Sequence, residues 1–409
     1  MLRFEQHYNR RLSLHEGGNV RVKKGTGMGG NVNVSLETAH KIPIDELSKT
    51  QFVQFKNEIT TTLKALNKAF EKQTGEALWS NIDSLIETGR LFSGSTRLLF
   101  TKALEDLKKY KKKVGDIDLQ YPEEKKGALK EFLTNSEDQK FGDMTYFGMG
   151  GNSPIQFNTI FKTTSLPDDV TNIQVDFEPT IWEDGEPTEF STYAHYSSWE
   201  DVQSQVKGAF SKLLMRSLTS NKERLGDVAV VTPTGKISTA AKYDNPGMRG
   251  FSVDKGLRVK YEPVLDDRGE QQKTDDGRPM YKEIPTKDSN YERDLADIFG
   301  FLFGQEPTED EKHLMHSYIG ILKLMKKYLD DDSENDVFDG FMKIIWGDMA
   351  QEIEQGEFKD GINTEDFSIK HAAYDQFVKV FPELRMSEEE LLNYVRPFYD
   401  KLAKKKIQK

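Results

Sequence analysis

Acidic residues on two predicted strands are the strongest candidates for chemistry in this chain. Residues 114–119 alternate as a strand does, so Asp116 and Asp118 project on one face. A second strand pattern follows further along, with Asp176 and Glu178 on one face. If the two strands are neighbours in one sheet, three or four carboxylates converge, and a cation must offset their repulsion. We therefore predict a site for Mg²⁺, which binds through carboxylates and substrate phosphates.

A turn of small residues precedes the first acidic strand. Ser93, Gly94 and Ser95 stand between a helix that we expect to end at Gly89 and a second helical run. Small residues let the backbone approach a triphosphate closely, and the positive end of the following helix favours its β- and γ-phosphates. The Ser95 hydroxyl can donate to the same anion. The turn is therefore a candidate nucleotide-binding element.

Together these residues resemble the nucleotidyltransferase superfamily, which shares a fold with DNA polymerase beta, the poly(A) polymerases and the tRNA CCA-adding enzymes. Its pattern is a Gly-Ser pair at a helix start, an Asp-x-Asp on the next strand and a third carboxylate on a later strand. In this chain the matching residues are Gly94, Ser95, Asp116, Asp118 and Asp176. The resemblance covers roughly residues 80–180 and extends less closely to about 220.

The spacing departs from the family in one place. The linker between the Gly-Ser pair and the Asp-x-Asp is longer than usual, and its extra length is the Lys- and Glu-rich segment 101–113. This segment is most simply interpreted as additional helical turns. Its lysines 108–113 are either a solvated helix end, favoured by the helix dipole, or a patch that steers polyanions to the site.

The resemblance implies an α+β fold in which a mixed sheet is flanked by helices. It also implies an enzyme that moves a nucleoside monophosphate from a nucleoside triphosphate to an acceptor hydroxyl and releases pyrophosphate. Asp116, Asp118 and Asp176 would be the catalytic residues and would hold two Mg²⁺ or Mn²⁺ ions. The acceptor would be an RNA or tRNA end, or a protein side chain. In its decorated core and lack of cysteine the chain also resembles bacteriophage proteins that carry this domain.

Two lysines are further candidates for contact with the nucleotide. An amphipathic helix is predicted to open at Ser198, which suits an N-cap, and to continue to Leu218. Lys207 and Lys212 lie along it and could reach the phosphates. An alternative to the whole enzyme hypothesis is a non-catalytic nucleotide-binding or structural protein that retains the fold. The long linker is compatible with that alternative, whereas retention of all three carboxylates is not what decay would predict.

Composition excludes several classes of protein. The net charge of −11 argues against binding of extended duplex DNA, which needs many cationic side chains, although a local basic groove remains compatible with it. The absence of cysteine excludes disulfides, thiolate zinc sites and a cysteine nucleophile. No apolar stretch approaches a membrane span, and residues 1–6 show no hydrophobic signal region. We expect a cytoplasmic protein, in the host cytoplasm if it is viral.

The chain of 409 residues is long enough for several domains. The patterns predict an N-terminal arm and helix over 1–78, a nucleotidyltransferase-like core over 79–225, a β-rich insertion over 226–290 and a helical domain over 291–409. Two glycine-rich patches, 15–19 and 24–31, lack the Gly-Lys-Ser/Thr ending of a P-loop and predict an ordered arm or loop. A hairpin is predicted over 141–165, with Gln156 and Asn158 on its return strand.

Overall fold

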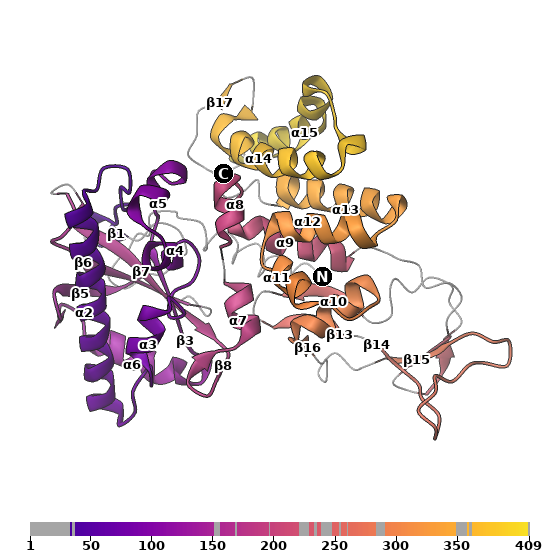
Figure 1. Cartoon of the computed structure of the whole chain (residues 1–409), viewed down its shortest axis with the longest axis horizontal. Coiled ribbons are helices and arrows are strands. Elements are labelled where there is room, and N and C mark those ends of the chain that lie inside the picture. The colour runs from indigo at the N-terminus through magenta and orange to yellow at the C-terminus, as the bar shows by residue number, and fades with distance from the viewer. Residues whose placement is uncertain are drawn as a thin grey trace. The chain divides into compact units, whose positions relative to one another are not determined.

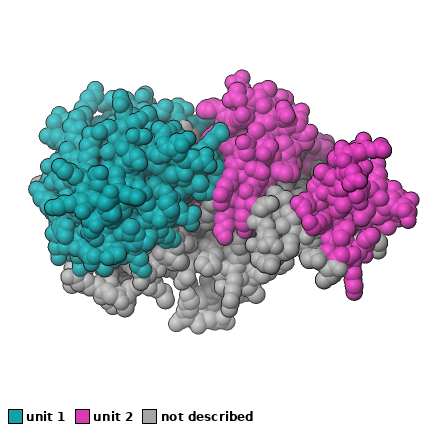
Figure 2. Space-filling view, turned by 90° about the horizontal axis from the view of Figure 1, so that it is seen from below, with its two compact units in different colours: residues 1–205 teal, residues 206–409 magenta. Residues whose placement is uncertain are grey.

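The computed structural model describes thirteen stretches of the chain: residues 33–34, 37–150, 156–167, 170–195, 197–220, 229–232, 235–238, 248–252, 255–259, 261–283, 291–348, 358–359 and 362–407. The glycine-rich patches at 15–19 and 24–31 lie outside these residues. The chain divides into two compact units, residues 1–205 and residues 206–409 (Figure 2). The finer division into four domains stays a prediction.

A five-stranded mixed sheet organises the first unit (Figure 1). The strand order is β3-β7-β6-β5-β4, in which β3 and β7 run parallel and the other neighbours are antiparallel. The predicted hairpin is confirmed as β5 and β6, and it extends the sheet beside β7. The strands are β3 (Ile117–Pro122), β4 (Lys140–Phe141), β5 (Met144–Gly150), β6 (Phe157–Lys162) and β7 (Asn172–Thr180).

The two faces of this sheet differ in chemistry because side chains alternate along each strand. On one face, apolar residues such as Leu119, Val175 and Phe177 are buried in the core of the unit. On the other face, Asp118 pairs in register with Asp176, and Asp176 with Asn158. The sequence therefore assigns the packing face and the chemical face at the same time.

Helix α2 (Lys49–Thr74) packs beside the apolar core, as its spacing predicts. It begins with a capping box between Ser48 and Gln51, which satisfies backbone N–H groups of the first turn. It ends at Gly75 in the left-handed conformation. Its Phe70 meets Phe132 of α6 (Lys126–Asn135) edge to face, with ring centroids 5.5 Å apart. This contact joins the two helices over the sheet.

Shorter elements complete the first unit. They are β1 (Asn33–Val34), β2 (Glu37–Thr38), α3 (Ile82–Glu87), α4 (Thr96–Thr101), α5 (Leu104–Tyr110), the 3-10 turn η1 (Glu123–Lys125), β8 (Trp182–Glu183), β9 (Glu186–Pro187), α7 (Glu189–Ala194) and α8 (Trp199–Gln203). Helix α5 confirms that the long linker adds helical turns.

The single helix predicted from Ser198 to Leu218 is wrong. Helix α8 ends at Gln203, and Gln205 has a φ of 59°, which a right-handed helix cannot accommodate. A new helix, α9 (Gly208–Ser220), begins after this break. The break coincides with the boundary between the two units.

The second unit combines small sheets with helices. Residues predicted to be β-rich form β10 (Ala229–Val231), β11 (Ile237–Ser238), β12 (Met248–Ser252), β13 (Gly256–Val259), β14 (Tyr261–Pro263) and β15 (Met280–Glu283). The remainder is mostly helical: β16 (Tyr291–Glu292), α10 (Leu295–Phe303), α11 (Glu309–Leu314), α12 (Tyr318–Tyr328), α13 (Asp331–Lys343), the π-helix η3 (Ile344–Asp348), β17 (Phe358–Lys359), β18 (Ile362–Asn363), α14 (Thr364–Val380), the 3-10 turn η5 (Pro382–Leu384) and α15 (Glu388–Ile407).

The fold is therefore α+β, with a mixed sheet near the N-terminus and a helical C-terminal region. Among the described helices, none combines the length and the apolar character needed to span a bilayer.

Candidate metal centre

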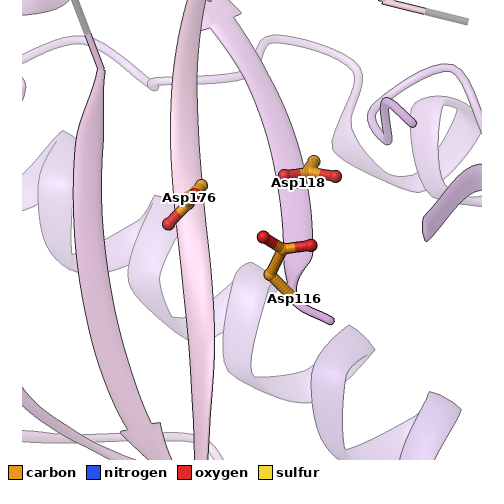
Figure 3. Close-up of side chains that lie close together, drawn as sticks. All are labelled: Asp116, Asp118 and Asp176. Atoms are coloured by element: carbon orange, nitrogen blue, oxygen red, sulfur yellow. The ribbon is translucent and has the colours of Figure 1, made fainter. Parts of the chain in front are cut away.

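Asp116, Asp118 and Asp176 form one cluster, in which the nearest carboxylate oxygens all lie within 4.8 Å of one another (Figure 3). Asp116 immediately precedes β3, and Asp118 lies within it. Asp176 on β7 is the register partner of Asp118. The prediction that the two acidic strands are sheet neighbours is confirmed, and the parallel pairing brings the three side chains to one face.

Burial sets the electrostatics of the cluster. Asp116 and Asp118 are each 6% exposed, and Asp176 is fully buried. Burial raises the pKa of Asp118 well above its ordinary value, and the charge of Asp116 raises it further. Burial and then Asp116 also raise the pKa of Asp176. A divalent cation would offset this repulsion, and three carboxylates are the oxygen donors that Mg²⁺ and Mn²⁺ take.

Three amide side chains fix the orientation of Asp176. Gln174 Nε2 lies 2.9 Å from Oδ1 and 2.8 Å from Oδ2 of this carboxylate. Asn158 Nδ2 and Gln156 Nε2 donate to Oδ2 at 2.9 and 3.2 Å. The return strand of the hairpin thus faces the third carboxylate. Gln174 was not singled out in the sequence, although its alternation with Asp176 already placed both on the same face.

The Ser93–Thr96 turn docks on the open edge of β3. Ser93 N donates to the Asp118 carbonyl oxygen at 3.1 Å, and Asp118 N donates to Thr96 Oγ1 at 2.8 Å. Gly94, with a φ of 50°, stands directly over the carboxylate, since a Cβ atom there would lie 2.8 Å from Asp118 Oδ2. The edge pairing of β3 therefore brings the small-residue turn to the acidic cluster.

Glu178, the fourth acid of the sequence pattern, serves the turn. Its Oε2 accepts a hydrogen bond from Ser93 Oγ at 2.6 Å and lies 3.0 Å from His195 Nδ1. The carbonyl oxygen of His195 in turn accepts from Gly94 N at 2.6 Å. All three side chains of this Ser93–Glu178–His195 network are buried or nearly so. His195 follows α7 and carried no sequence signal, because its role depends on chain segments that are remote in sequence.

The remaining predicted residues divide between the two units. Ser95 lies at the start of α4, where its Oγ accepts a hydrogen bond from Lys111 Nζ at 2.5 Å. Lys207 and Lys212 belong to the second unit; Lys207 precedes α9, and Lys212 is a buried residue within it. A contact of these two lysines with the nucleotide stays a prediction.

Comparisons with known proteins add no relative. No protein-family model matches the sequence, and a search of curated proteins also gives no match. What the chain does is therefore inferred from the geometry around the three carboxylates.

Proposed function

We propose that this protein is a metal-dependent nucleotidyltransferase related to the superfamily that includes DNA polymerase beta. It would transfer a nucleoside monophosphate from a nucleoside triphosphate to an acceptor hydroxyl. The observation that carries the proposal is the buried cluster of Asp116, Asp118 and Asp176 beside a small-residue turn. A cluster alone could be a structural metal site, whereas a cluster with an adjacent anion-binding turn has the two parts that a metal–triphosphate complex requires.

Each part of the site has a role in this reaction. Asp116 and Asp118 would hold the ion that contacts the triphosphate, and with Asp176 they would hold a second ion. When bound, the ions would offset charge on the pyrophosphate and lower the pKa of the attacking hydroxyl. The backbone at Gly94 and the hydroxyl of Ser95 would bind the β- and γ-phosphates.

The bonds exchange at the α-phosphorus. The acceptor oxygen forms a bond to this atom, and the bond to the bridging oxygen of the β-phosphate breaks, so pyrophosphate leaves with the electron pair. We assign to Asp176 the proton of the acceptor hydroxyl, because its buried environment favours the protonated carboxyl. Its amide neighbours keep the accepting oxygens in a fixed position.

Transfer of label tests the proposal. The protein is incubated with each α-labelled nucleoside triphosphate, Mg²⁺ or Mn²⁺, and either total RNA or a cell lysate. Label should move to a macromolecule with the wild type and not with Asp118→Asn. The matched control is Asp184→Asn, because Asp184 is an exposed acid with a φ of 52°, a conformation that Asn tolerates.

The same assay separates the enzyme from its alternative. RNA labelling favours an RNA or tRNA acceptor, and labelling of polypeptide favours a protein side chain. Metal-dependent stabilisation by a nonhydrolysable triphosphate, without transfer to any fraction, would support the non-catalytic nucleotide-binding protein instead. Neither binding nor transfer would overturn both.

A further inference from the structure

Lys111 is set apart from the other lysines of its run. It follows the last residue of α5, and its backbone N–H donates to the Leu107 carbonyl oxygen at 2.8 Å. Its ammonium group donates to Ser95 Oγ at 2.5 Å, and its side chain is partly buried. Lys112 and Lys113, the next two residues, are exposed. One cation of the run therefore points to the small-residue turn.

Tertiary contacts hold the backbone on both sides of Lys111. The Lys112 carbonyl oxygen accepts from Asp45 N at 3.1 Å, and Val114 pairs with Ile42 through two backbone hydrogen bonds of 2.8 and 3.0 Å. Before Lys111, the ring of Tyr110 meets Trp199 edge to face with centroids 5.5 Å apart. The position of Lys111 is thus fixed by packing, which reduces the entropy cost of using it to bind a ligand.

The charge of Lys111 also reaches the acidic cluster. Its ammonium group is the one cation that opposes the raised pKa of Asp118, against the effects of burial and the neighbouring acids. A lysine that contacts Ser95 and acts on Asp118 lies between the turn and the carboxylates. A hydroxyl and an ammonium group side by side offer several donors to a phosphate oxygen.

From this geometry we infer that Lys111 and Ser95 form the subsite for the terminal phosphates of the substrate, the part that leaves as pyrophosphate. The inference rests on the proposed function and specifies its ligand as a metal-bound polyphosphate. The Lys111 ammonium group would contact the β- and γ-phosphates directly, so it would stabilise the negative charge that grows on the leaving group. The expectation that the lysine run is only a solvated helix end does not account for the contact with Ser95.

Binding of inorganic tripolyphosphate in the presence of Mg²⁺, measured by calorimetry, tests this subsite without requiring the transfer reaction. Lys111→Gln should weaken the affinity about tenfold to a hundredfold, the usual effect of losing a charged hydrogen bond. Lys111→Arg should retain most of it because the charge remains. Lys112→Gln, which removes an exposed lysine one residue away, should leave the affinity unchanged. Binding of Mg²⁺ alone and the melting temperature should be the same in Lys111→Gln as in the wild type within a few degrees.

The outcomes separate the subsite from the function. If Lys111→Gln binds tripolyphosphate as tightly as the wild type does, or if Lys112→Gln weakens it equally, the subsite is wrong even when nucleotidyl transfer is observed. If Lys111→Gln does not fold, retention of affinity by Lys111→Arg together with its loss in Ser95→Ala supports the subsite, and unchanged affinity in Ser95→Ala overturns it. If the wild type binds tripolyphosphate through Lys111 but transfers no nucleotide, the subsite stands and the proposed reaction fails.

Discussion

Gly94 stands over Asp118 so closely that a Cβ atom at Gly94 would lie 2.8 Å from Asp118 Oδ2. The same residue has a φ of 50°, in the left-handed region that favours glycine. Two separate constraints, backbone conformation and proximity to a carboxylate, therefore require glycine at this position. The close approach also leaves the space above Asp118 open to a ligand rather than to a side chain.

We expect Gly94→Ala to displace the Asp118 carboxylate and to weaken Mg²⁺ binding by at least tenfold, a change that calorimetry would detect. The backbone strain should add about 1 kcal/mol of destabilisation. Gly75→Ala is the matched control, since Gly75 has a φ of 87° but its Cβ would meet nothing within 4 Å. It should cost similar stability and leave metal binding intact. Equal loss of metal affinity in both variants would contradict the contact with Asp118.

Stability without metal should depend on pH through Asp118. Its pKa is raised in the folded protein by burial and by Asp116, so the folded state retains a proton that the unfolded chain has already released. The stabilisation is complete below the ordinary pKa of aspartate and is lost as the pH rises through the raised pKa. In EDTA, Asp118→Asn should therefore melt at a higher temperature than the wild type, by a margin that grows with pH.

Mg²⁺ should reduce this margin, because the ion offsets the repulsion among the ionised carboxylates in the wild type. Melting curves recorded from acidic to mildly basic pH, with and without Mg²⁺, would measure it. A wild type and an Asp118→Asn variant with parallel profiles in EDTA would show that the acids do not oppose one another.

Glu178 should act by positioning the turn. Glu178→Ala removes the acceptor for both Ser93 Oγ and His195 Nδ1, and a buried donor left without a partner costs about 1–3 kcal/mol. We expect a lower melting temperature and weaker binding of triphosphate, with a smaller effect on Mg²⁺ affinity. Glu178→Gln retains an acceptor oxygen and should recover part of both losses. A variant that loses Mg²⁺ and triphosphate affinity equally would instead indicate that Glu178 is a metal ligand.

Another buried acid, Glu58 on α2, should matter for folding alone. It is 4% exposed and accepts hydrogen bonds from Thr163 Oγ1 at 2.5 Å and Thr164 N at 2.9 Å, as well as from Ser165 Oγ. It thus holds the connection between β6 and β7. Glu58→Ala should lower the free energy of unfolding by about 2–3 kcal/mol in denaturant titrations. The exposed Glu71→Gln on the same helix should change it by less than about 0.5 kcal/mol. Loss of triphosphate binding in a folded Glu58→Ala protein would be unexpected.

Local patterns in the sequence predicted much of the first unit. Alternation on 114–119 and 172–178 assigned Asp116, Asp118 and Asp176 to one face, and three-to-four spacing predicted α2. These predictions succeed because strand and helix periodicity is a property of neighbouring residues. The same approach joined α8 and α9 into one helix, since the apolar spacing continues through Gln205 and does not reveal its positive φ.

The sequence by itself determined which acids can share a face and which small residues can approach a phosphate. Tertiary structure alone decided their partners: that β3 lies beside β7, that Glu178 binds Ser93 across 85 residues of chain, and that Lys111 is the lysine of its run that meets Ser95. The physical reason is that such contacts depend on strand order and on packing between distant segments. Residue types and spacing do not encode these in any local pattern.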